Sequence, residues 1–184
     1  SGINLVHPFS DIFSAIVQAG GVNDKGSLRE VQLIRNGQII STVDFYSFFM
    51  DGKNTFSSIK LIDGDVIHIP NVKKRVSISG QVNRPSTYEL LSGETVSDII
   101  TYASGFASDA SSSLILNQII PVEERSSDDN ARTSVTINFK NKESIMLNNG
   151  DSITVPSISR VDLNIEIYGR VKSAGSYPGA NTTL

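Results

Sequence analysis

The stretch Val76-Ser-Ile-Ser-Gly-Gln-Val-Asn-Arg-Pro-Ser-Thr-Tyr-Glu-Leu90 occurs twice in this chain. Its second copy, Ile165-Glu-Ile-Tyr-Gly-Arg-Val-Lys-Ser-Ala-Gly-Ser-Tyr-Pro-Gly179, begins 89 positions later. In both copies apolar residues alternate with polar ones up to a turn, which predicts a half-buried β-hairpin. Glycine holds the same position in each first strand, at Gly80 and Gly169. A glycine inside a strand predicts a bulge or a close backbone approach.

A helix pattern repeats as well. The first apolar stripe has the spacing i, i+3, i+4, i+7 and consists of Ile12, Ala15, Ile16 and Ala19. It predicts a helix over residues 10–21 with Ser10 as its N-cap and the four apolar side chains of the stripe buried. The equivalent stripe, 84 positions later, consists of Val96, Ile99, Ile100 and Ala103. It predicts a helix over residues 95–104, with Thr95 as N-cap and Asp98 in the capping-box position.

The remaining segments predict strands. Residues 30–35 and 38–43 alternate around Asn36-Gly37, which favours a type I′ hairpin turn. Residues 44–50 are rich in aromatic side chains and are consistent with a short helix or a loop that caps the core. In the second copy, we predict strands over residues 114–120 and 134–139.

A closing strand is marked by the pattern Leu-x-x-Gly-Asp-x-Ile-x-(Ile/Val)-Pro, at residues 61–70 and again at 147–156. The pattern predicts a tight turn and a last strand that proline ends, because proline cannot donate to a ladder. The polar loop at residues 121–133 has no counterpart in the first copy, and we expect it to be exposed and mobile.

These repeats predict the fold class and the domains. A hairpin, one main helix and returning strands make an α+β fold of tandem β-grasp repeats, each a mixed sheet with one helix. We expect a repeat lacking its first strand at residues 1–72, a complete repeat at 73–158, and the opening hairpin of a third at 159–184. Because both ends are incomplete, we expect the chain to be a piece of a longer protein.

Composition limits the function. The chain has 184 residues and a net charge of -3, so no global basic field favours nucleic acid. It has no cysteine and two histidines, His7 and His68, at no ligand or triad spacing. Asp63 and Asp65 lie in a turn pattern rather than a calcium loop. We therefore expect no metal, no cofactor, no catalytic residues and no membrane-spanning segment.

Few residues are candidates for binding. Tyrosines suit sugar rings and arginines suit acidic groups, so the hairpins offer weak glycan-binding candidates: Arg84, Tyr88, Arg170 and Tyr177. The alternative is that both tyrosines pack each hairpin on its own helix. The basic run at residues 73–75 is most simply a solvated linker, with contact to an anionic polymer as the alternative.

Three features of the chain resemble those of a known family. They are the pattern Gly80-x-Val82-x-x-Pro85-x-x-Tyr88, the helix that follows it, and the pattern Gly150-Asp151-x-Ile153-x-Val155-Pro156. The chain resembles the SLBB (soluble-ligand-binding β-grasp) repeats of bacterial outer-membrane polysaccharide export proteins, the Wza-like family. The resemblance implies a non-enzymatic periplasmic module of a polysaccharide export channel. Its implied partners are polysaccharide, further copies in a ring, and an inner-membrane polysaccharide co-polymerase.

Two rival functions stay open. Similar β-grasp repeats occur in DNA-uptake and cobalamin-binding proteins, so a small-ligand or nucleic-acid binding module is the first. A polysaccharide-modifying enzyme is the second, and it would need two carboxylates about 5–10 Å apart in a cleft. The incomplete first repeat also predicts an open sheet edge. We hypothesise that the hairpin at residues 161–179 fills this edge, in a neighbouring molecule or by folding back.

Overall fold

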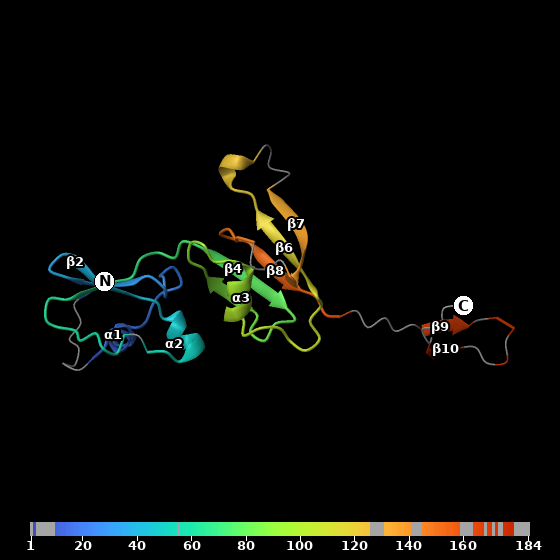
Figure 1. The fold of residues 1–184 in the computed structure, drawn as a ribbon, viewed down its shortest axis with the longest axis horizontal. Coiled ribbons are helices and arrows are strands. Elements are labelled where there is room, and N and C mark those ends of the chain that lie inside the picture. The colour runs from blue at the N-terminus through green and yellow to red at the C-terminus, as the bar shows by residue number, and fades with distance from the viewer. Residues whose placement is uncertain are drawn as a thin grey trace.

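The computed structural model describes residues 2, 10–54, 56–125, 131–140, 145–158, 164–167, 169, 170, 172 and 175–178. Over these residues the chain forms two α+β units, each with its own sheet, and a two-stranded hairpin (Figure 1). The predicted fold class, α+β with tandem β-grasp repeats, is confirmed.

The first unit contains two helices and a three-stranded sheet. Its elements are α1 (Ile12–Gln18), β1 (Val31–Arg35), β2 (Gln38–Val43), α2 (Tyr46–Asp51) and β3 (Val66–His68). The strands are antiparallel in the order β2-β1-β3. At the β1–β2 turn, φ is 50° at Asn36 and 76° at Gly37, and these two positive values confirm the type I′ turn.

Helix α1 is shorter than the sequence pattern predicts. Its N-cap is Asp11 and not Ser10, because the Asp11 carboxylate accepts a hydrogen bond of 2.7 Å from the Ser14 backbone N–H. The helix ends at Gln18, so Ala19 lies exposed and the prediction that it is buried was wrong. The other three residues of the stripe are buried as predicted.

The second unit is a five-stranded mixed sheet with one α-helix. Its elements are β4 (Arg75–Gly80), β5 (Ser86–Glu89), α3 (Val96–Tyr102), β6 (Ser113–Ile119), the 3₁₀ turn η1 (Val122–Glu124), β7 (Arg132–Asn138) and β8 (Ser152–Val155). The strand order is β5-β4-β8-β6-β7, with β4 and β8 parallel at the centre. The predicted loop at 121–133 is shorter than expected, since β7 begins at Arg132. Residues 126–130 lie outside the described residues.

Helix α3 agrees with its sequence pattern. Thr95 caps it, and the Asp98 carboxylate accepts the Thr95 N–H at 2.7 Å, which confirms the capping box. All four residues of the predicted stripe are at most 5% exposed. They pack with the inner faces of β4, β6 and β8 in one core.

Gly80 allows β4 and β8 to come close together. Its φ is 83°, and a Cβ atom there would lie 2.1 Å from the carbonyl oxygen of Val155. The same carbonyl accepts the N–H of Gln81 at 2.8 Å. The predicted close approach is thus confirmed at Gly80. At Gly169, φ is 113° and no described atom lies within 4 Å of an added Cβ, so only the backbone conformation there requires glycine.

The hairpin that we expect to open a third repeat consists of β9 (Asn164–Ile167) and β10 (Gly175–Pro178). These antiparallel strands form a sheet of their own and add no strand to either larger sheet. The fold-back version of the predicted docking is therefore not what the structure has. Docking on a neighbouring molecule stays a prediction.

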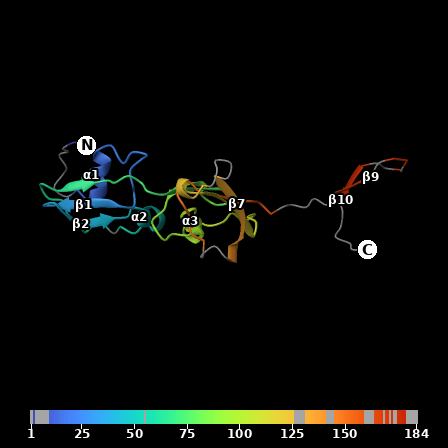
Figure 2. The ribbon, with the colours of Figure 1, turned by 90° about the horizontal axis from the view of Figure 1, so that it is seen from above.

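The two units have separate cores that meet at helix α2. Figures 1 and 2 both show α2 on the side of the first unit that faces α3. Phe45, before α2, is 1% exposed in the core of the first unit. Tyr46 and Met50 of α2 pack instead against the core of the second unit. This short helix thus joins the two units.

Candidate functional site

The most highly organised group of polar side chains lies where the two units meet. We call it the junction and define it by seven residues: Ser27, Arg29, Asp44, Tyr46, Glu89, Glu94 and Tyr102. The first four come from the first unit, from the loop before β1 and the start of α2, and the last three from the second unit. Buried polar groups need partners, and within the described residues every buried side-chain nitrogen and oxygen has one.

Arg29 is the centre of the junction, and it is 6% exposed. Its guanidinium donates to the Asp44 carboxylate at 2.9 Å and to the Glu94 carboxylate at 2.7 Å. A further hydrogen bond of 3.3 Å reaches the backbone carbonyl of Glu89. One arginine therefore connects an acid of its own unit to two residues of the other unit, and its planar set of donors suits this role better than a lysine would.

Two tyrosine rings enclose the same guanidinium. The Arg29 Cζ atom lies 4.6 Å from the Tyr46 ring centroid and 5.0 Å from that of Tyr102. The rings meet edge to face, with centroids 5.2 Å apart. Cation–π contacts are strongest where water is excluded, so the rings help to hold a charge that burial alone would destabilise.

Glu89 makes the reciprocal contacts from the second unit. It is 7% exposed, and its carboxylate accepts hydrogen bonds from the Ser27 hydroxyl at 2.5 Å and from the Leu28 backbone N–H at 2.8 Å. Its own N–H donates to the Tyr46 hydroxyl at 2.8 Å. The backbone and side chain of one residue at the end of β5 thus hold the first unit at several points.

The environment of the junction raises the pKa values of three of its residues, Arg29, Tyr46 and Tyr102. Burial would lower the pKa of Arg29, but its hydrogen bonds with Glu94 and Asp44 outweigh that effect and raise the pKa. Burial, and then the hydrogen bond to Glu94, raise the pKa of the Tyr102 hydroxyl. Burial also raises the pKa of Tyr46. Acid–base catalysis needs a group that titrates near the working pH, so these residues are suited to fixing two units in one orientation rather than to proton transfer.

The sequence-predicted candidates do not come together in a site. Arg84 lies exposed in the turn between β4 and β5. Tyr88 is 7% exposed in the core of the second unit, and its hydroxyl donates to the Arg84 carbonyl at 2.8 Å. Burial raises the pKa of that hydroxyl. Little of the Tyr88 ring is available to a sugar, and a glycan role of either residue stays a prediction.

The other candidates lie at the edge of what the structure describes. Arg170 is exposed in the turn after β9. Tyr177 lies in β10, pairing with Ile165, and its side chain is outside the described residues. His68 is exposed on β3, and His7 is outside the described residues.

Other predicted features have structural partners. The Asp65 carboxylate accepts the Ile62 N–H at 2.9 Å and pairs with Arg35 at 2.8 Å, so it closes the turn before β3. In the basic run, Lys73 pairs with Glu30 at 2.8 Å across the linker. Arg75 donates to the carbonyl of Asp24. No group of three or more potential metal ligands occurs in the described part of the chain.

Sequence reasoning missed the junction. Nothing in the local pattern distinguishes Arg29 from its neighbours in the sequence, and Glu89 belongs to the repeated hairpin without being repeated itself. Its equivalent in the third repeat is Pro178, 89 positions later. The burial of Glu89 at the end of β5 follows from its contacts with the first unit, so it can be recognised only once the two units are placed together.

Two β-grasp units with separate cores and a buried polar junction define a tandem-repeat protein rather than a single enlarged domain. A family model described as the SLBB domain matches residues 4–43 and 75–125, which lie in the first and second units. The chain therefore carries SLBB repeats, as the resemblance predicts. SLBB is a ligand-binding domain and not a catalytic family. No curated protein gives a significant match to the chain.

No helix in the described ranges is long and apolar enough to cross a membrane.

Proposed function

We propose that this chain is a periplasmic module of a polysaccharide export channel, acting in oligomer assembly and in the passage of the glycan. The observation that carries the proposal is the SLBB match in both units, because SLBB domains are found in polysaccharide export proteins. The absence of a strong basic field, with a net charge of -3, favours a glycan over nucleic acid as the polymer.

The junction supports a role in a channel wall. A wall made of several copies needs each copy to keep one shape, and inter-domain motion is the default unless the interface is well packed. Here Arg29 and Glu89 join the units through buried, fully partnered groups. The partners in this proposal are further copies of the chain in a ring, an inner-membrane polysaccharide co-polymerase, and the polysaccharide itself.

The experiment is an in-frame deletion of residues 12–156 from the gene of the full-length protein, in its own bacterium. A parallel strain carries Arg29→Met with Glu94→Met, which removes the ion pair between the two units. The matched control carries Lys53→Met, because Lys53 forms an exposed ion pair within the first unit. Surface polysaccharide is measured together with the amount of each protein in the cell.

We expect the deletion to abolish surface polysaccharide, the junction variant to reduce it at an unchanged amount of protein, and the control to export normally. Normal export from the deletion strain would overturn the proposal. A mobility shift of labelled DNA by the purified chain, without retention on polysaccharide, would support the nucleic-acid alternative instead.

A further inference from the structure

The two units have equivalent sheets, and their outer faces can be compared position by position. Leu33 pairs with Ile67 in the first unit, and Leu116 pairs with Ile153 in the second; all four side chains point to the cores. The next pair along is Ile34 with Val66 in the first unit and Asn117 with Ser152 in the second. Because side chains alternate along a strand, this second pair faces away from the core in both units.

At the compared positions the outer face is apolar in the first unit and polar in the second. Ile34 also pairs with Ile39, and its equivalent Asn117 pairs with Ser134. Ile39 is 57% exposed and Val66 is 55% exposed. The second unit forms the same sheet with asparagine and serine at these positions. The fold therefore does not require aliphatic side chains there, and exposed apolar groups that the fold does not require mark an interaction surface.

A β-bulge enlarges this surface. The register of β1 and β2 shifts between Leu33 and Ile34, so Ile40 is an extra residue in β2. A bulge places two successive residues opposite one and can turn an additional side chain to the same face. Ile40 is accordingly 51% exposed beside Ile39. The β6–β7 pairing of the second unit runs through seven residue pairs without a shift. We define the outer patch as Ile34, Ile39, Ile40 and Val66.

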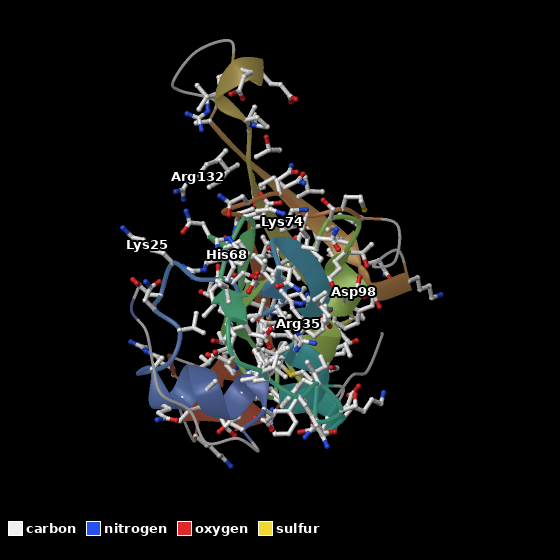
Figure 3. All side chains as sticks on the ribbon, turned by 90° about the vertical axis from the view of Figure 1, so that its left-hand side faces the viewer. Lys25, Arg35, His68, Lys74, Asp98 and Arg132 are labelled. Atoms are coloured by element: carbon white, nitrogen blue, oxygen red, sulfur yellow. The ribbon has the colours of Figure 1, made fainter. Side chains whose placement is uncertain are left out.

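The rim of the outer patch consists of polar side chains and one internal ion pair. Gln32, Thr42 and His68 continue the same face, and they form one row across the three strands. At the other end, the guanidinium of Arg35 is paired with the carboxylate of Asp65 at 2.8 and 2.9 Å. Figure 3 shows Arg35 and His68 on the side of the molecule that the first unit occupies. Two such faces can approach each other without the like-charge repulsion that opposes self-association.

We propose that the outer patch binds the same patch of a second copy of this chain, face to face. An isologous contact needs a self-complementary surface, and an uncharged aliphatic patch meets that condition. Branched side chains from two sheets interdigitate when sheets pack in this way, with the sheets about 10 Å apart. Since four side chains a side are far fewer than the roughly 20–30 residues of a stable interface, the contact is weak in isolation. It is independent of whether the chain exports polysaccharide.

The first test is sedimentation velocity on the purified chain from about 10 μM to about 1 mM, the range in which weak contacts show. The variant Ile34→Asn, Ile39→Ser, Val66→Ser gives the first unit the residues that the second unit has. Val135→Ser is the control, because Val135 is 42% exposed on β7 and outside the outer patch. We expect the sedimentation coefficient of the wild type and control to rise more steeply with concentration than that of the triple variant, in which only the outer-patch contact is removed.

A wild type that remains monomeric throughout, or a triple variant that associates equally, would overturn the proposal. In the first case the patch would serve a different protein or the polysaccharide. If circular dichroism shows that the triple variant is unfolded, Ile39→Ser alone is used, since Ile39 is more than half exposed and its replacement leaves the core untouched.

A second test uses the absence of cysteine from the chain. Thr42→Cys places one thiol beside the outer patch, and Thr136→Cys places one at the equivalent position of the second unit, since Thr42 pairs with Gln32 and Thr136 pairs with Ile115. Both threonines are exposed. With a flexible dithiol-reactive crosslinker, we expect dimers from Thr42→Cys well in excess of those from Thr136→Cys. Equal yields would contradict the face-to-face contact.

Discussion

The guanidinium of Arg29 holds a full positive charge where only 6% of the residue is exposed. A charge in such a place is tolerated when every donor has a partner and the partners are themselves charged. Asp44, Glu94 and the Glu89 carbonyl supply those partners. The value of such a network lies mainly in orientation, because replacing a whole buried ion pair with apolar groups is often neutral, whereas removing one member is not.

Arg29→Met tests this at the residue scale. The substitution leaves the acids Asp44 and Glu94 without their cation, and removing one member of a buried pair costs ~3–5 kcal/mol of unfolding free energy. We expect the lower end, because the Asp44 side chain stays 34% exposed. Lys53→Met, in an exposed pair with Asp51, should cost at most ~1 kcal/mol. Urea denaturation of both variants gives the comparison, and equal small losses would mean that the junction contributes little.

Asp65 and Asp151 have the same task in the two units. Each lies after the glycine of the closing pattern, and each carboxylate accepts the backbone N–H three residues earlier, from Ile62 at 2.9 Å and from Asn148 at 2.7 Å. They differ in their second partner. Asp65 binds the guanidinium of Arg35, and Asp151 accepts the N–H of Ile119 at 2.9 Å. The repeated Gly-Asp is therefore explained by a turn.

Because Asp65 is charged in this turn, we expect its contribution to the stability of the fold to depend on pH. The hydrogen bond with Arg35 lowers the pKa of Asp65. A carboxyl group whose folded pKa is lowered contributes stability above its ordinary value of about 3.9 and loses it as the pH falls through the lowered one. We expect the fall in melting temperature between about pH 7 and pH 3 to be smaller in Asp65→Asn than in the wild type. Asp63→Asn, at an exposed neighbour, should behave as the wild type, and an unchanged fall in Asp65→Asn would contradict the assignment.

At the scale of elements, α3 shows how one helix closes the second core. Ile100 is 5% exposed on its buried stripe. Ile100→Asp would place an unpaired charge among aliphatic side chains, and we expect a loss above ~4 kcal/mol, sufficient to unfold this unit. Thr101→Asp, on the exposed face of the same helix, should cost no more than ~1 kcal/mol. A soluble Ile100→Asp protein that unfolds cooperatively would count against the packing described here.

The close pairing of the parallel strands β4 and β8 requires glycine at position 80. Gly80 and Gly93 have similar positive φ values, 83° and 88°, but only Gly80 has a neighbouring backbone within reach of a Cβ. Alanine at Gly93 should cost the ~1–2 kcal/mol of a left-handed residue. Alanine at Gly80 should cost clearly more, because the strands must also separate. Thermal unfolding of both variants measures the difference, and equal losses would mean that the close approach carries no energetic weight.

Elements were the part of this fold that sequence could predict. The alternation in residues 76–90 and the helical stripe from Val96 to Ala103 report on local burial, so they identify strands and helices directly. The N-cap of α1 was predicted wrongly, because Ser10 and Asp11 are both good N-cap residues and only the backbone conformation decides between them. The junction could not be predicted, since Ser27 and Glu89 are 62 residues apart and meet only through the placement of two units.

At the scale of the whole molecule, the positions at which the repeats differ are the ones that form the junction. The Arg29 position corresponds to Ser112 in the second unit, and the Glu89 position corresponds to Pro178 in the third repeat. The junction between the first two units therefore cannot be formed again between the second and the third.

The hairpin of β9 and β10 leads to the last prediction. In the second unit, β8 pairs with β6 on one side and with β4 on the other. In the first unit, the equivalent strand β3 pairs with β1, and no described strand occupies its other side. A sheet edge with unpaired N–H and C=O groups recruits a strand, and β9 is the repeat equivalent of β4. We expect β9 to pair with β3 of a neighbouring molecule, in a head-to-tail contact distinct from the outer patch.

Deletion of residues 161–184 tests this contact. We expect the truncated chain to have a lower mass in solution by light scattering than the full chain, and a lower melting temperature of the first unit, because the edge of β3 loses its partner. Ile39→Ser in the outer patch is the matched comparison, since it leaves both β9 and β3 unchanged and should keep the head-to-tail contact. If the truncated chain keeps the same mass and the same melting temperature, the hairpin fills no such position and is only the beginning of the third repeat.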